Sequence, residues 1–91
     1  MAEGNINISN LWSKATWGTT LTVPYSMNII VFFSGVNNQQ EMWLYNVEPD
    51  ILTHVVGLNR TLTATKNSDG SITFTVDVAG SLAVIAILRL I

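Results

Sequence analysis

The closing stretch of the chain reads Leu82-Ala83-Val84-Ile85-Ala86-Ile87-Leu88-Arg89-Leu90-Ile91, and its pattern decides the fold class. Side chains alternate across a strand, so even-numbered residues would share one face and odd-numbered residues the other. Both faces would be apolar, with Arg89 as the single charge. An outer strand of a small monomer needs only one apolar face. We therefore expect this strand to lie between two apolar surfaces, one of which can belong to a second subunit.

The middle of the chain contains two further strand patterns around a polar loop. Asn28–Ser34 is rich in β-branched and aromatic residues and is apolar on both faces. Glu41–Val47 reads as the returning strand after the loop 35–40, which is rich in Asn and Gln. A shorter alternation, Thr19–Val23, stops at Pro24, which cannot continue a ladder from a central position.

The second half of the chain predicts a hairpin. Thr61–Thr65 and Ser71–Asp77 alternate cleanly. In the first strand Leu62 and Ala64 share the face opposite the threonines, and in the second strand Ile72, Phe74 and Val76 are expected to point inward. The segment Asn67-Ser68-Asp69-Gly70 between them is a strong hairpin turn. Ile51–Gly57 is too short for a typical helix and favours a short strand, and Ala79-Gly80 predicts a turn into the final strand.

These patterns predict an all-β fold. About seven short strands with regular turn signals are typical of a compact antiparallel β-sandwich or a jelly-roll-like domain. We place this domain at residues 19–91 and interpret residues 1–18 as an irregular lead-in with a short strand at Ile6–Ser9.

Composition excludes several classes of partner. Of the 91 residues 48% are hydrophobic and only 11% are charged. The net charge is −2, and the four Lys and Arg residues are too scattered to form a basic stripe that could bind nucleic acid. The longest apolar run, Leu82–Leu88, is far shorter than the ~18–20 residues of a membrane-spanning helix. No signal peptide pattern is visible at the N-terminus. We therefore expect neither nucleic-acid binding nor membrane insertion.

The sequence offers no motif for catalysis, a metal or a cofactor. The chain has no cysteine and one histidine, His54, whose setting is more typical of a strand residue than of a ligand. The carboxylates mostly fall at turns and strand edges, Glu41 among them, where solvated acids are ordinary. We expect the protein not to be an enzyme.

Aromatic and amide side chains are the candidates for ligand binding. On the strand Glu41–Val47 we expect the Met42/Leu44 face to be core, which would expose Trp43 and Tyr45 or place them at an interface. Such rings can stack on sugars, although packing is the commoner role of strand aromatics. The preceding loop contributes amides that suit hydroxyl-rich ligands, although most polar loops bind nothing; its candidates are Asn37, Asn38, Gln39 and Gln40.

The two strands that are apolar on both faces predict a homo-oligomer. One thin core of a 91-residue chain can hardly cover two such strands. Part of their surface is therefore expected at subunit contacts. The candidate interface residues are Ile29, Val31, Phe33, Ile85 and Ile87.

Several features together resemble the distal domains of bacteriophage tail fibres and receptor-binding proteins. They are the Thr/Asn-rich alternating strands, the hairpin Lys66–Phe74, the lack of cysteine, the polar opening Asn5–Ser9 and the apolar terminal strand. The resemblance implies a homotrimer around a three-fold axis whose β-structured heads bind cell-surface saccharide or protein through loops. It also implies an extracellular location on the virion, as an excised head domain or a small standalone virion protein.

The leading hypothesis is thus a non-enzymatic fibre or receptor-binding head domain that assembles as a homo-oligomer and attaches to a host surface. A purely structural virion or trimerisation domain would oligomerise without binding a ligand. A small carbohydrate-binding module would instead be monomeric and carry an aromatic platform.

Overall fold

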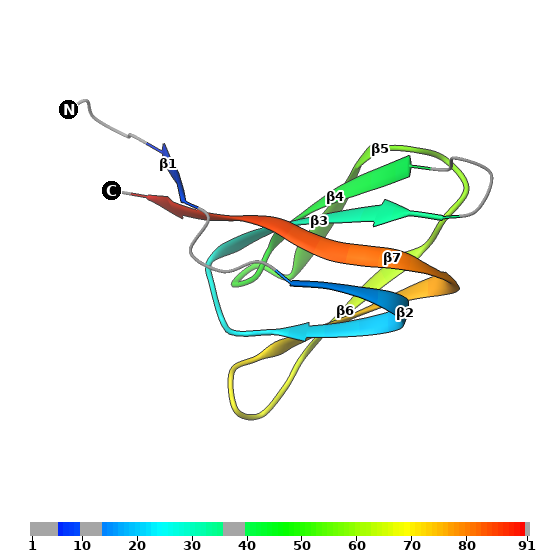
Figure 1. Cartoon of the computed structure of the whole chain (residues 1–91). Coiled ribbons are helices and arrows are strands. Elements are labelled where there is room, and N and C mark those ends of the chain that lie inside the picture. Colours follow the sequence, from blue (N-terminus) through cyan, green and yellow to red (C-terminus); the bar gives the residue numbers. More distant parts are fainter. Residues whose placement is uncertain (1–5, 10–13, 36–39, 91) are drawn as a thin grey trace.

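The described residues form seven strands (Figure 1). The computed structural model describes the backbone of residues 6–9, 14–35 and 40–90, and the side chains of residues 15–35 and 40–84. The strands are β1 (Ile6–Ser9), β2 (Lys14–Val23), β3 (Asn28–Ser34), β4 (Gln40–Asn46), β5 (Ile51–Val56), β6 (Leu62–Lys66) and β7 (Ile72–Leu90). The all-β prediction is therefore confirmed for the described residues.

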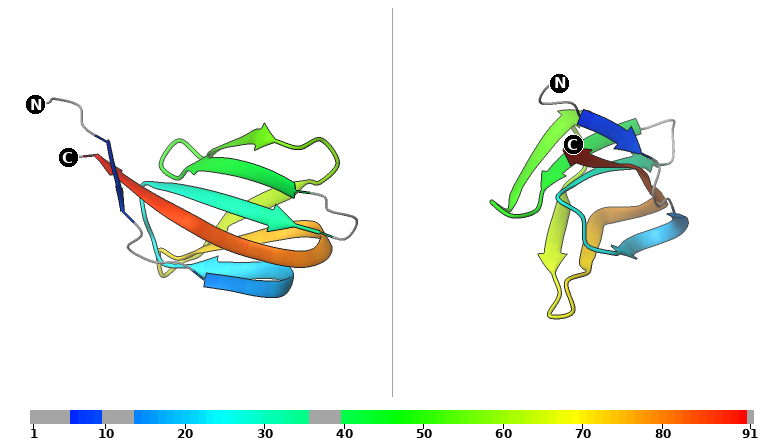
Figure 2. Two further views of the ribbon diagram at one scale, coloured as in Figure 1. Left: turned by 45° about the horizontal axis from the view of Figure 1, so that its top comes forward. Right: turned by 90° about the vertical axis from the view of Figure 1, so that its left-hand side faces the viewer.

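All seven strands belong to one antiparallel sheet that is organised around β7. The main path runs β1-β7-β3-β4-β5, and β2 and β6 also pair with β7. The first part of β7 pairs with β6 and with the end of β2, and its later part pairs with β3. Figure 2 shows how this curved strand carries the sheet over on itself, so that the two ends of β7 lie in different layers.

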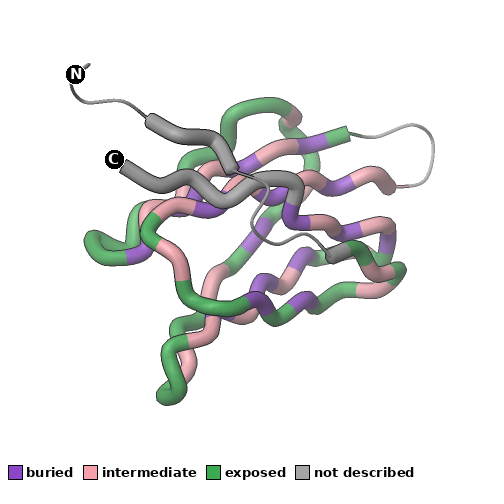
Figure 3. Tube along the Cα trace, turned by 60° about the vertical axis from the view of Figure 1, so that its left-hand side comes forward, coloured by how far each residue is buried: buried purple, intermediate pink, exposed green. Residues whose placement is uncertain are grey.

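The core lies inside this fold and is built from alternate residues of the strands (Figure 3). β3 shows strict alternation: Ile29, Val31 and Phe33 are 0% exposed. The hairpin prediction is also confirmed, because Ile72, Phe74, Val76 and Leu62 are buried and Gly70 has a φ of +94°. Tyr45 meets Phe74 edge to face across the core, with ring centroids 5.7 Å apart.

The expected turn at Ala79-Gly80 is replaced by a bend within β7. Gly18 of β2 pairs with Gly80 and Thr20 pairs with Thr75, so the β7 residues 76–79 lie opposite Thr19 alone. A Cβ at Gly80 would come within 2.5 Å of the Phe33 ring, so the bend brings the backbone directly onto that side chain. β2 begins at Lys14, which extends the regular structure into the segment interpreted as an irregular lead-in.

The assignment of β4's two faces was wrong. Trp43 is 2% exposed and Tyr45 is 0% exposed, whereas Met42 and Leu44 stay partly exposed on the other face. The register explains this result, because Trp43 pairs with Val31 and Tyr45 with Ile29, and paired residues share a face of the sheet. Glu41 lies on this same face and is buried with the two aromatic side chains.

The interface residues proposed on β3 were wrong as well. The chain's own core covers Ile29, Val31 and Phe33 completely, so these side chains have no surface left for a second subunit. Ile85 and Ile87 lie in β7, but their side chains are outside the described residues. The β3–β7 register shifts between Ile30, which pairs with Ala86, and Val31, which pairs with Val84. Regular alternation through the terminal stretch is therefore interrupted opposite this point.

Candidate functional site

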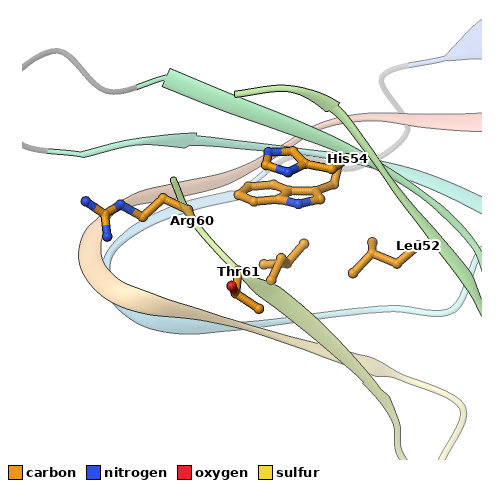
Figure 4. Close-up of a pocket in the computed structure, with 6 residues that line it drawn as sticks. Leu52, His54, Arg60 and Thr61 are labelled. Atoms are coloured by element: carbon orange, nitrogen blue, oxygen red, sulfur yellow. The ribbon is translucent and has the colours of Figure 1, made fainter. Parts of the chain in front are cut away.

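A small open pocket lies between the sheet edge formed by β4 and β5 and the start of β6 (Figure 4). It encloses about 250 Å³. Its lining residues are Trp43, Leu52, His54, Arg60, Thr61 and Leu62. These residues are brought together because β5 pairs with β4, while the loop 57–61 leads the chain from β5 into β6.

The inner wall of the pocket is an aromatic stack. Trp43 and His54 are paired across β4 and β5, and their rings stack with centroids 4.8 Å apart and an interplanar angle of 15°. Figure 4 shows the imidazole on one face of the indole, with Thr61 on the opposite side. The indole is almost fully buried, whereas His54 keeps an exposed edge.

Behind this stack, the buried carboxylate of Glu41 holds the loop. Glu41 is 2% exposed, and its Oε1 lies 2.8 Å from His54 Nε2. The backbone N–H of Asn59 donates to Oε2 over 3.0 Å, and that of Arg60 donates to Oε1 over 3.1 Å. Every buried polar side-chain atom of the described residues has a hydrogen-bond partner, which is what makes a buried carboxylate tolerable.

Gly57 makes this close approach possible. It has a φ of +104°, and a Cβ at this position would come within 2.6 Å of both Cγ and Cδ of Glu41. A residue without a side chain is therefore required where the loop crosses the carboxylate. The placement of Glu41 among solvated acids was wrong, and the pairing of Glu41 with His54 was missed.

Arg60 and Thr61 form the outer rim of the pocket. Arg60 Nη1 lies 3.8 Å from Asp77 Oδ2 in β7, and the backbone N–H of Asp77 donates to the Thr61 carbonyl over 3.2 Å. These contacts tie the rim to the second layer of the sheet. A guanidinium and a hydroxyl thus stand beside an aromatic wall and two leucines.

The predicted ligand residues are only partly brought together. Trp43 lines the pocket from its buried position, while Tyr45 lies in the core and donates its hydroxyl to Asp50 Oδ1 over 2.5 Å. Gln40 is exposed at the start of β4. Asn37, Asn38 and Gln39 lie outside the described residues. Leu52, His54, Arg60 and Thr61 were not predicted, because the pairing of β5 with β4 brings the first two beside Trp43 and the loop 57–61 brings the other two.

The pocket presents aromatic, aliphatic and hydrogen-bonding side chains. Among the side chains described, no group of three or more His, Asp or Glu residues could hold a metal ion. Over the described residues, no helix is long and apolar enough to cross a membrane. Comparison of the chain with protein-family models, curated proteins and solved structures found no match.

Proposed function

We propose that this chain is a binding and assembly domain without catalytic activity. It forms a homo-oligomer, expected to be a trimer, within a virion fibre and attaches to a saccharide or protein on a host surface. The resemblance to fibre and receptor-binding heads supports the virion location. The pocket between β5 and β6 is the observation that carries the attachment.

The pocket's chemistry favours a saccharide over a protein as the ligand. A sugar ring has an apolar face of C–H groups and a rim of hydroxyls, and it needs both apolar surface and hydrogen-bonding groups. Leu52 and Leu62 supply the first, while Thr61 and Arg60 supply the second. The volume of about 250 Å³ is below the range of drug-sized ligand sites and suits a single sugar unit.

A glycan array with the wild-type chain tests this attachment, followed by titration of each glycan that binds. Thr61→Val removes one hydroxyl while keeping the shape of the side chain and the carbonyl that accepts from Asp77. Loss of the hydrogen bond between the Thr61 hydroxyl and the sugar should weaken binding by roughly 5–10-fold. Thr65→Val is the matched control, because Thr65 is an exposed β6 residue that does not line the pocket. The saccharide proposal fails if no glycan binds, or if the two variants bind alike.

A purely structural virion domain without ligand is the second candidate. It is favoured by large apolar side chains that remain on the surface of the single chain. Leu58 is 94% exposed, and Trp17, Ile51, Val55 and Val56 are each more than half exposed. Contacts with other subunits would cover such surface. This candidate predicts an oligomer that binds neither glycans nor cells.

A further inference from the structure

The outer face of the sheet formed by β3, β4, β5 and part of β7 has an apolar centre, with the uncharged residue Thr53 beside Leu44 and the uncharged pairs Asn28–Asn46 and Ser34–Gln40 at its ends. Residues that pair across neighbouring strands share a face. Ile30 pairs with Leu44, and Phe32 pairs with both Met42 and Ala83, while Val56 extends the row from Met42. We define the outer face by these six residues, namely Ile30, Phe32, Met42, Leu44, Val56 and Ala83. All of them are partly or fully exposed, in contrast to the buried inner face of β3 and β4.

This outer face also lacks charge. No outward position of β3 or β4 holds an acidic or basic residue, and β5 has no Lys, Arg, Asp or Glu. Glu41 points into the core, and the Arg60–Asp77 pair lies at the β6 and β7 side of the fold. An acidic or basic partner would find no complementary group here. Other copies of the chain present the same uncharged face, so copies arranged around a three-fold axis can bring these faces together without repulsion.

The size of the face is sufficient for such a contact. Four strands spaced by about 4.8 Å and seven residues long at about 3.3 Å per residue cover roughly 440 Å² in flat projection. Side-chain relief makes the accessible area larger, which brings it to the order of the per-partner area of a small specific interface, about 500–600 Å².

We propose that copies of this chain associate through the outer face, with Phe32 and Leu44 near its centre. The inference rests on the proposed function in that it identifies where the expected homo-oligomer is formed. It assigns the contact to the even-numbered residues of β3 and not to Ile29, Val31 and Phe33. The pocket at β5 and β6 opens on the other side of β4, as its lining by Trp43 and His54 requires, and stays accessible.

Sedimentation velocity of the 91-residue chain over a range of concentrations tests the proposal, with circular dichroism and urea unfolding to verify the fold. Phe32→Glu places a carboxylate in the apolar contact and should raise the dissociation constant of the oligomer at least ~100-fold. Thr65→Glu introduces the same charge on an exposed β6 strand position away from the outer face and should leave the constant unchanged. Leu44→Thr is a milder second variant that should raise it at least ~10-fold, and it decides the matter if Phe32→Glu does not fold.

The outcomes separate the two proposals. If the wild type oligomerises and folded Phe32→Glu and Leu44→Thr dissociate as expected, the outer face is the contact. If the wild type oligomerises and folded variants at the outer face associate as strongly as Thr65→Glu, this inference is wrong while the proposed assembly stands. If the wild type is a monomer at high micromolar concentration, both the contact and the assembly are refuted.

Discussion

Glu41 is the single residue on which the local structure of the pocket depends most. Its carboxylate accepts from His54 Nε2 and from the backbone N–H groups of Asn59 and Arg60. In Glu41→Gln the amide N–H₂ group would face at least one of these donors. A buried donor left without an acceptor costs about 1–3 kcal/mol. We expect the free energy of unfolding, measured in urea, to fall by about 2 kcal/mol.

Glu48→Gln is the matched control, because Glu48 is exposed and its contact with the Tyr25 hydroxyl needs only an acceptor oxygen. Its effect should stay within about 0.5 kcal/mol. Equal stability of the two variants would show that the carboxylate does not hold the loop.

The buried hydroxyl of Tyr45 makes the stability of the protein depend on pH. Burial, the hydrogen bond to Asp50 and the negative charge of Asp50 raise the pKa of Tyr45 to about 12. The unfolded chain loses this proton near its ordinary pKa of about 10. The native state therefore binds more protons than the unfolded state between pH 10 and 12, so stability is present below pH 10 and declines across this window.

Tyr45→Phe removes this titration while keeping the ring in the core. Urea unfolding at pH 9 to 12 should show a smaller loss of stability in the variant than in the wild type. Parallel pH profiles for the two proteins would contradict the assigned environment of Tyr45.

Among the structural elements, the loop between β5 and β6 determines the shape of the pocket. Gly57→Ala forces a Cβ within 2.6 Å of the Glu41 side chain at a φ of +104° and should lower the free energy of unfolding by at least ~2 kcal/mol. Gly18→Ala in β2 is the control, because a Cβ there meets nothing within 4 Å. Urea unfolding should show the control as stable as the wild type or slightly more so. Similar losses at both glycines would contradict the close approach of this loop.

The strands themselves could be predicted from the sequence, because alternation and turn residues are local signals. Asn28–Ser34 was expected with the bounds that β3 has, and the hairpin around Gly70 was expected with its inner residues. The bend of β7 could not be predicted, because it depends on Phe33 packing against Gly80 from a distant part of the chain.

The face of β4 illustrates the same difference between local and long-range information. Both faces of that strand are apolar enough to be core, and Glu41 is buried through partners that are distant in the sequence. Its partners come from β5 and from the loop beyond, 13 to 19 positions along the chain. The pocket residues Arg60 and Thr61 were missed for the same reason. Glu41 beside Trp43 and Tyr45 was a sequence signal for these contacts, because an acid on a buried aromatic face needs hydrogen-bond donors from other parts of the chain.

The whole molecule has few charges, since only 11% of its residues are charged. The inner faces of the strands form a core that one copy completes by itself. The outer face remains as an uncharged apolar surface, and the pocket lies away from it. A fibre or receptor-binding head has these two needs, because it must join its own copies and still present a site to the host.

Small-angle X-ray scattering from the wild-type chain at several concentrations tests whether copies of the chain assemble. One copy has a mass of 10.0 kDa and a Cα radius of gyration of 13.1 Å. A homo-oligomer has a scattering mass of at least two chains, three for the expected trimer, with a radius of gyration well above that of a single copy. A mass of one chain and a radius near 13.1 Å at every concentration would contradict this assembly.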